Sequence, residues 1–371
     1  MEVFKVLQFG KYYPPAIGGM EKVIFSLTEG INEAGIVCDV LCSNTQNIEA
    51  IDTTRGYTVY RAKSYGVLFS MSIAPGLIKL LWRMRKRYDI IHFHHPDPMS
   101  ALALFITRPK AKIVIHWHLD IVKQKIAYVF YRPLEMWLLK RADKIIATSP
   151  NYLQHSKPLG PFRGKCTVIP LGIQPLPPVN EDRIKALREK YPGRHIIFSL
   201  GRFTSYKGFE YLILSAEFLS EDFQIVIGGD GPLKSKMEKM IDDRQLARKV
   251  KLIGKMAEED VLAYFAACDV FCLPSVTKNE AFGLVILEAM NYGKPIIATT
   301  IKGSGTSWVN QHGLTGVNVP PFDASALAIA IKDLAVQPKA EIMGINAKMR
   351  FESTFTNDRM MKSVLELYAH I

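Results

Sequence analysis

The sequence predicts an α/β protein built from two doubly wound parallel sheets. Short apolar runs alternate with amphipathic helices along the chain, which is the pattern of a parallel sheet covered on both faces. The prolines between Pro170 and Pro178 interrupt this alternation, and it starts again after them. The length of 371 residues also exceeds what one compact core usually holds. We therefore expect two similar domains facing a cleft, with ligands at the carboxyl ends of the strands.

The first domain is expected to span residues 1–173. A helix, Met20–Ala34, follows the first strand through a loop with Gly18-Gly19, and Gly35 ends it. The strands predicted for this domain are Val3–Phe9, Val37–Cys42, Tyr57–Arg61, Ile90–His94, Lys112–His116, Lys144–Thr148 and Cys166–Ile169.

The second domain is expected to span residues 179–354, and it repeats the alternation of strands and helices. Its predicted strands are His195–Leu200, Phe223–Gly228, Val250–Ile253, Val270–Leu273 and Pro295–Thr299. Its predicted helices are Asn180–Lys190, Phe209–Leu219, Leu233–Asp243 and Glu258–Ala266, and a last helix of the chain covers Asn357–His370.

One stretch of the second domain, Asn279–Gly293, predicts a nucleotide-sugar site. Gly283 lies where a short helix begins, and the amides of a helix N-terminus attract a phosphate. Glu280 precedes that point and Glu288 lies inside the helix, where its side chain leans back toward the N-terminus. Carboxylates accept hydrogen bonds from sugar hydroxyls. Two glutamates flanking a phosphate site therefore indicate a ligand with a sugar on each side of its phosphates.

The loop Gly201–Gly208 brings two cations, Arg202 and Lys207, to the end of another strand. Such a pair can hold a diphosphate and stabilise its charge as it leaves. Solvated surface cations are the alternative reading. Gly228-Gly-Asp-Gly is a weak phosphate signature that a tight turn explains equally well. Gly18-Gly19 can bring backbone amides close to a phosphate or simply open a helix.

Five histidines, His92, His94, His95, His116 and His118, lie at the ends of two consecutive strands. A His-x-His pair there could chelate zinc, which makes a metal-dependent hydrolase an alternative. No matching acidic ligands accompany them, and the chain has no Asp-x-Asp motif for a metal on a diphosphate. We favour His118 as functional, because it directly follows a strand and can reach the cleft.

The net charge of +12 lies almost entirely in the first half of the chain. Residues 1–175 hold 23 Lys+Arg and 12 Asp+Glu, and the remainder holds 24 and 23. The first domain is thus expected to face something anionic. A nucleic-acid binder would explain the charge but not the glutamates, and a sugar-binding receptor would normally carry an export signal. We find no signal-peptide pattern and no apolar run long enough to span a bilayer, and expect a cytoplasmic protein.

Several weak motifs occur together in this chain. They are Glu280-x7-Glu288 with Phe282-Gly283, Gly201-Arg202 with Lys207-Gly208, Gly228-Gly-Asp-Gly, Gly18-Gly19 and Val168-Ile-Pro-Leu-Gly. In combination they resemble glycosyltransferase family 4, retaining enzymes of the GT-B fold, over nearly the whole chain. The run from His116 to Lys125, with Tyr131-Arg-Pro-Leu and Thr148-Ser-Pro-Asn-Tyr, is similar to bacterial mannosyltransferases that build O-antigen or other surface polysaccharides.

This resemblance implies a hexosyltransferase with no metal cofactor and a nucleotide-sugar donor, GDP-mannose first and a UDP-hexose as the alternative. It implies a donor site made of Gly19, Arg202, Lys207, Lys255, Met256, Glu280, Phe282, Gly283, Leu284 and Glu288. The catalytic residues implied are Glu280, His118, Arg202 and Lys207. It also implies that a C-terminal helix, about residues 355–371, packs back on the first domain.

The resemblance further assigns a role to each group. Arg202 and Lys207 would hold the diphosphate, and Glu288 the ribose. Glu280 would lie beside the transferred sugar, with His118 near its 6-hydroxyl. Attack by the acceptor hydroxyl on the front face of the anomeric carbon would retain its configuration, and a double displacement through a carboxylate is the alternative.

The acceptor implied by the resemblance is a polyprenyl-diphosphate-linked or other glycan at the inner face of the cytoplasmic membrane. The stretch Pro75–Tyr88 predicts a helix with an apolar face and a basic end. Its basic residues, which we predict to contact anionic lipid or the acceptor, are Arg83, Arg85, Lys86 and Arg87. The alternative is a helix that covers the sheet and has a solvated basic tip. We expect no nucleic-acid partner.

Overall fold

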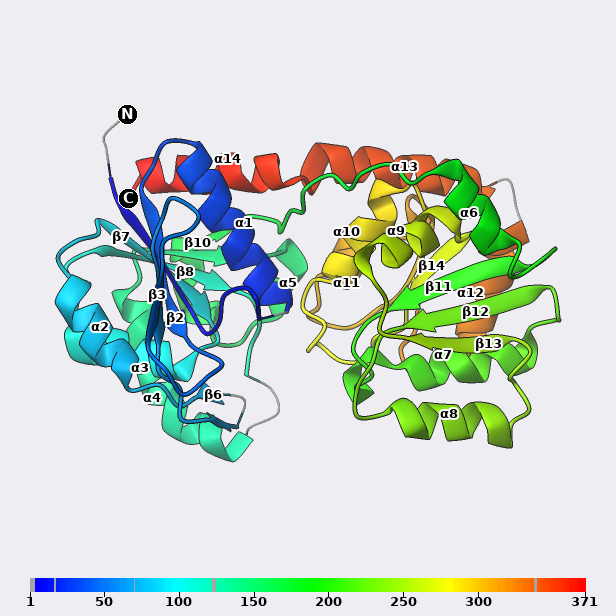
Figure 1. Cartoon of the computed structure of the whole chain (residues 1–371), viewed down its shortest axis with the longest axis horizontal. Helices are drawn as coiled ribbons and strands as arrows, with labels where there is room; N and C mark the ends of the chain where they lie inside the picture. The colour runs from blue at the N-terminus through cyan, green and yellow to red at the C-terminus, as the bar shows by residue number, and fades with distance from the viewer. Residues whose placement is uncertain (1–3, 17, 70, 122–124, 337–338) are drawn as a thin grey trace. The chain divides into compact units, whose positions relative to one another are not determined.

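The computed structural model describes residues 4–16, 18–69, 71–121, 125–336 and 339–371, and the chain divides into two compact units (Figure 1). Unit 1 consists of Met1–Leu171 and Asn357–Ile371, and unit 2 of Gly172–Thr356. Within the described residues, every helix is too short or too polar to cross a bilayer.

Unit 1 is built on an eight-stranded sheet with the order β10-β9-β8-β7-β1-β2-β4-β3. Its strands are β1 Val6–Gly10, β2 Cys38–Ser43, β3 Ala50–Asp52, β4 Val59–Ala62, β7 Ile90–His95, β8 Lys112–Trp117, β9 Lys144–Ala147 and β10 Cys166–Val168. All neighbours are parallel except β3 and β4. The order reverses between β1 and β7, and doubly wound sheets bind their ligands at such a reversal point.

The helices of unit 1 cover both faces of this sheet. They are α1 Gly19–Glu33, α2 Gly76–Met84, α3 Pro98–Thr107, α4 Lys125–Arg141, α5 Pro150–His155 and α14 Asn357–Ala369. A small hairpin, β5 Val67–Leu68 and β6 Met71–Ser72, follows β4.

 The last of these helices, α14 (Asn357–Ala369), packs beside α1 (Figure 1). Right-handed crossovers place α2, α3 and α4 on the opposite face, where α3 contacts both of its neighbours.

Unit 2 is built on a six-stranded parallel sheet with the order β13-β12-β11-β14-β15-β16. Its strands are β11 His195–Leu200, β12 Phe223–Gly228, β13 Val250–Gly254, β14 Val270–Leu273, β15 Ile296–Thr299 and β16 Gly316–Val319. This is the strand order of a dinucleotide-binding fold, and its reversal point lies between β11 and β14. The two sheets confirm the predicted fold class.

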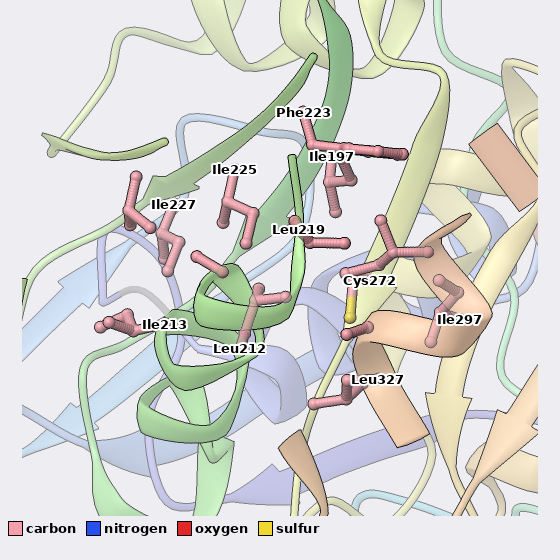
Figure 2. Close-up of a cluster of buried hydrophobic side chains, with 14 of the residues drawn as sticks. Ile197, Leu212, Ile213, Leu219, Phe223, Ile225, Ile227, Cys272, Ile297 and Leu327 are labelled. Atoms are coloured by element: carbon pink, nitrogen blue, oxygen red, sulfur yellow. The ribbon is translucent and has the colours of Figure 1, made fainter. Parts of the chain in front are cut away.

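The helices of unit 2 are α6 Glu181–Arg188, α7 Phe209–Ser215, α8 Lys234–Asp243, α9 Glu258–Ala267, α10 Leu284–Asn291, α11 Thr306–Val309, α12 Ala324–Val336 and α13 Lys339–Thr354. A large part of the core lies between the sheet and α7 and α12 (Figure 2). Ile197, Ile225 and Cys272 reach it from three strands, and Leu212 and Leu327 from the two helices. This apolar layer fixes the ends of β11 and β14, from which the candidate site is built.

The helix α2 is shorter than the predicted stretch Pro75–Tyr88, and its apolar face does not face solvent. Leu77, Leu80, Leu81 and Met84 are buried, and α2 contacts α3, β2 and β4. The structure thus favours the second of the two alternatives, a helix that covers the sheet and has a solvated basic tip. The basic end remains solvated: Arg83, Lys86 and Arg87 are exposed, and Arg85 stacks over the Trp82 ring at 3.7 Å.

Candidate functional site

A buried ion pair lies at the point where the strand order of unit 2 reverses. Lys207 follows β11 and Glu280 follows β14, and their Nζ and Oε2 atoms are 2.6 Å apart. Each side chain is only 11% exposed. The hydroxyl of Ser275 donates to the same carboxylate oxygen at 2.9 Å. Two residues that are 73 positions apart are thus joined because β11 and β14 are neighbours in the sheet.

The loop that carries Lys207 depends on a glycine. Gly208 has a φ of +64°, and a Cβ at this position would overlap the carbonyl oxygen of Pro274. The amide of Val276 donates to the carbonyl of Tyr206 at 2.8 Å, so the loops after β11 and β14 are also joined by backbone. A side chain at Gly208 would push these loops apart and separate Lys207 from Glu280.

The pair keeps Lys207 charged although it is buried. Burial acts to lower the pKa of Lys207, but the negative charge of Glu280 and its hydrogen bond to the ammonium oppose this effect, and the net pKa is raised. A fixed ammonium with little water around it attracts a phosphate more strongly than a solvated one. Arg202, the second predicted cation, is exposed at the start of the same loop.

The N-terminus of α10 adds backbone donors to this edge of the sheet. Gly283 precedes the helix with a φ of +83°, and among the described residues no side chain caps this terminus. Glu280 is held close to it, since its carbonyl accepts from the Ser304 hydroxyl and the Ala281 carbonyl accepts from the Gly305 amide at 2.7 Å. An open helix N-terminus beside a lysine is suited to bind a phosphate.

Three further predicted residues lie on or near α10. Glu288 is half-buried in the second turn, and Leu284 is half-buried at the first position. Phe282 is buried, with its ring edge on Phe355 at 6.0 Å between centroids, so its side chain belongs to the core of unit 2. Any contact of Phe282 with a donor would have to come from its backbone.

The turn Gly228–Gly231 supports the loop after β11. A Cβ on Gly229 would overlap the carbonyl oxygen of Gly201, and one on Gly231 would lie 2.7 Å from the Phe203 nitrogen. The Phe203 amide donates to the Asp230 carbonyl at 2.9 Å. Close backbone packing therefore explains these glycines without a phosphate.

Lys255 and Met256 follow β13 at the same edge of the sheet. A Cβ on Gly228 would lie 2.6 Å from the Met256 methyl carbon, which places Met256 against the end of β12. Lys255 is exposed. The resemblance to the family implies that Lys255 and Met256 contact the nucleotide base of the donor, and this contact stays a prediction.

In unit 1, His118 ends a chain of hydrogen bonds that starts on β1. The side-chain amide oxygen Oε1 of Gln8 accepts from His94 Nε2 at 2.7 Å, so this nitrogen carries the proton. His94 Nδ1 then accepts from His118 Nε2 at 2.9 Å. His118 is left with a lone pair on Nδ1, which can accept a hydrogen bond from a hydroxyl. Burial lowers the pKa of His118 to about 3, so the ring is neutral at physiological pH.

The other histidines pack as a stack of rings. His92 and His94 lie 4.8 Å apart between centroids, and His116 and His118 lie 4.3 Å apart. The ring nitrogens of His92, His94 and His116 approach within 4.8 Å of one another, as a metal site requires. All three side chains are fully buried, and His92 is hydrogen-bonded to Tyr368 of α14. Burial lowers the pKa of all three histidines, so the rings pack in their neutral form.

The remaining predicted residues belong to unit 1. Gly19 is the first residue of α1, at the reversal point between β1 and β7. The basic end of α2 lies at the opposite, amino edge of the sheet, because Asp89 and Ile90 then pair with Lys5 as β7 begins. Sequence reasoning missed Gln8, Ser275 and Ser304. Only Gln8 carried a signal, as a polar residue in the apolar run Val6–Gly10.

Two family models match this chain. The model described as Glycosyltransferase Family 4 matches residues 17–175, and the model described as Glycosyl transferases group 1 matches residues 180–350. Together they cover most of both units.

Whole-length relatives are found among bacterial enzymes. The chain is 33% identical to O-antigen chain mannosyltransferase C of Escherichia coli over 361 residues, which is 96% of this chain and 95% of that protein. It is 34% identical to D-rhamnosyltransferase WbpZ of Pseudomonas aeruginosa over 356 residues, which is 95% of this chain and 92% of that protein.

Solved structures share the fold of this chain. Sucrose-phosphate synthase of Thermosynechococcus elongatus matches with a TM-score of 0.81 at 22% identity, over 99% of this chain and 98% of that one. Anabaena HepE in complex with UDP matches with a TM-score of 0.79 at 21% identity, over 99% of this chain and all of that one. The fold is that of the GT-B glycosyltransferases.

Proposed function

The chain belongs to glycosyltransferase family 4, and we propose that it is a retaining mannosyltransferase that uses GDP-mannose. Its acceptor in this proposal is a lipid-linked glycan in the synthesis of O-antigen or another surface polysaccharide. The name of the Escherichia coli relative supports the sugar and the pathway. A UDP-hexose is the alternative donor.

The observation that carries the proposal is the Lys207–Glu280 pair beside the open N-terminus of α10. A lysine and a set of amides can hold the two phosphates of a donor, and the adjacent carboxylate can bind hydroxyls of the sugar attached to them. Glu288, in the second turn of α10, is proposed to bind the ribose. Arg202 is proposed to close on the diphosphate from the exposed start of its loop.

The proposed reaction is a front-face substitution. The acceptor oxygen bonds to the anomeric carbon as the bond from that carbon to the phosphate oxygen breaks, and the acceptor proton passes to the departing diphosphate. Lys207, Arg202 and the amides of α10 stabilise the charge that develops, so no metal is needed. Glu280 is a poor candidate for a covalent nucleophile, because Lys207 and Ser275 both bind its Oε2 atom.

The donor is tested with a panel of sugar nucleotides and measurement of released GDP or UDP. We expect release from GDP-mannose, and release from UDP-glucose alone would establish the alternative. His118, whose Nδ1 can accept a hydrogen bond, is proposed to bind the 6-hydroxyl. We therefore expect slower transfer from the 6-deoxy analogue of GDP-mannose, because that analogue leaves the acceptor nitrogen unpaired.

The role of Lys207 is tested by Lys207→Ala. We expect kcat to fall by about 100-fold or more, as for the loss of one group that stabilises developing charge. Lys239→Ala is the matched control, since Lys239 is a solvated lysine of the same unit. Near-normal turnover of Lys207→Ala would remove this residue from the mechanism. Activity should survive EDTA, and a loss that only a divalent ion restores would contradict the metal-free reaction.

The membrane is part of this proposal through the acceptor. A polyprenyl diphosphate stays in the bilayer, so an enzyme that uses it must work at the membrane surface. The excess of basic residues in the first half of the chain, 23 against 12 acidic ones, suits the anionic inner face of the cytoplasmic membrane.

A further inference from the structure

Large apolar side chains are exposed in two segments of unit 1. In the hairpin, Val67, Leu68 and Phe69 are 50–67% exposed. In the first turns of α4, Ile126 and Phe130 are each 81% exposed and Val129 is 67% exposed. Exposed single apolar residues are ordinary, but two groups of three that lie together mark a contact surface.

The topology brings these two segments to the same edge of the sheet. The hairpin follows β4 and α4 follows β8, so both start from the carboxyl ends of parallel strands. The helix α3 contacts both β6 and α4, which places the segments on the same side as well. We call the six residues Val67, Leu68, Phe69, Ile126, Val129 and Phe130 the apolar edge.

The charge around the apolar edge identifies its partner. Between Lys63 and Ile73 the sequence has one Lys and no Asp or Glu, and between Ile121 and Leu134 it has three Lys or Arg and no Asp or Glu. Two copies of such a surface would repel each other. An anionic bilayer satisfies both features, since its headgroups attract the cations and its interface accepts aromatic and aliphatic side chains.

We propose that the apolar edge inserts into the interface of an anionic lipid bilayer. This assignment replaces α2, whose apolar face is buried and whose basic end lies at the other edge of the sheet. The apolar edge lies at the carboxyl edge, where doubly wound folds bind their ligands, so an acceptor anchored in the bilayer would arrive beside the site. The inference rests on the lipid-linked acceptor of the proposed function for its purpose, but its test does not require transfer.

The test is co-sedimentation with vesicles of phosphatidylethanolamine and phosphatidylglycerol. Two triple variants change the apolar edge: Val67→Ser/Leu68→Ser/Phe69→Ser and Ile126→Ser/Val129→Ser/Phe130→Ser. We expect each to lower the partition coefficient at least about 10-fold, because each removes three side chains that the interface would bury. Thermal unfolding followed by circular dichroism checks that the variants are folded.

The matched control lies on α13 of unit 2. Ile342, Ile345 and Met349 are 55–62% exposed, and their triple Ser variant should bind vesicles as the wild type does. Wild-type binding by both variants of the apolar edge would overturn the proposal. So would a dimer of the wild type on gel filtration that these variants dissociate, because a second copy would then be the partner.

The outcome is separable from that of the proposed function. If the protein binds vesicles through the apolar edge but releases no GDP from GDP-mannose, GDP-mannose is rejected as the donor and the membrane-docking surface is retained. Phe130→Trp gives an independent measurement. Its fluorescence should shift to the blue and be quenched by brominated lipid, and an unchanged spectrum with vesicles would contradict insertion.

Discussion

Replacing Lys207 by Met leaves the Glu280 carboxylate in the interior of unit 2 without its cationic partner. Met matches the length of Lys but carries no charge, so Glu280, whose side chain is 11% exposed, keeps only the hydroxyl of Ser275 as a partner for its Oε2 atom. Breaking a buried ion pair on one side costs about 3–5 kcal/mol. At about 2–4 °C per kcal/mol for a domain of this size, this lowers the Tm of unit 2 by about 6–20 °C.

Differential scanning calorimetry is the suitable assay, because the two units need not unfold in one transition. The double variant Lys207→Met/Glu280→Gln removes the unpaired buried charge of Glu280 and should be more stable than Lys207→Met alone. Lys239→Met is the control. Lys239 and Asp243 pair at 3.0 Å with side chains 75% and 58% exposed, and such surface pairs contribute about 0–1 kcal/mol. An equal effect of Lys207→Met and Lys239→Met would refute the argument from burial.

Two further predictions concern the loops and the histidines. Gly208→Ala should destabilise unit 2 by more than the about 1–2 kcal/mol that a left-handed backbone costs alone, because the new Cβ overlaps Pro274. Gly35→Ala measures that backbone cost, since Gly35 has a φ of +78° and open space around it. An equal loss of Tm in the two variants would argue against the overlap. His92 and His118 have pKa values of about 3 in the folded chain, below the 6.5 of the unfolded chain, so the unfolded state binds more protons as the pH falls below 6.5. Each of these two histidines should therefore lower the free energy of unfolding by about 1.4 kcal/mol for every pH unit below 6.5. A Tm of unit 1 that stays constant from pH 7.5 to 5.5 would show that these rings titrate normally.

The positions of the predicted strands and loops could be inferred from the sequence because strand and helix periods differ and glycines mark the turns. Gly208 and Gly283 both adopt the positive φ that such turns require. The pairing of Lys207 with Glu280 could not be inferred, since it depends on β14 crossing to the far side of β11. No local sequence pattern shows that β14, and not another strand, lies beside β11.

The helix α2 shows why an apolar stripe alone is ambiguous. The spacing of Leu77, Leu80, Leu81 and Met84 predicts one buried face, but a sheet and a lipid surface would select the same spacing. Only the elements that surround α2 decide whether a sheet or a lipid surface covers this face, and those elements are distant from α2 in the sequence. The exposed residues of α4 were missed for the opposite reason, because Ile126, Val129 and Phe130 read as an ordinary core face until the packing is known.

The return of α14 to unit 1 also bears on how the chain folds as the ribosome makes it. Met361 packs against Gly30 and Tyr368 hydrogen-bonds His92, so the first sheet lacks part of its cover until residues 357–369 have been synthesised. Unit 2 is continuous in sequence and can close earlier. Until α14 has been synthesised, an apolar strip along α1 therefore stays uncovered in the nascent chain.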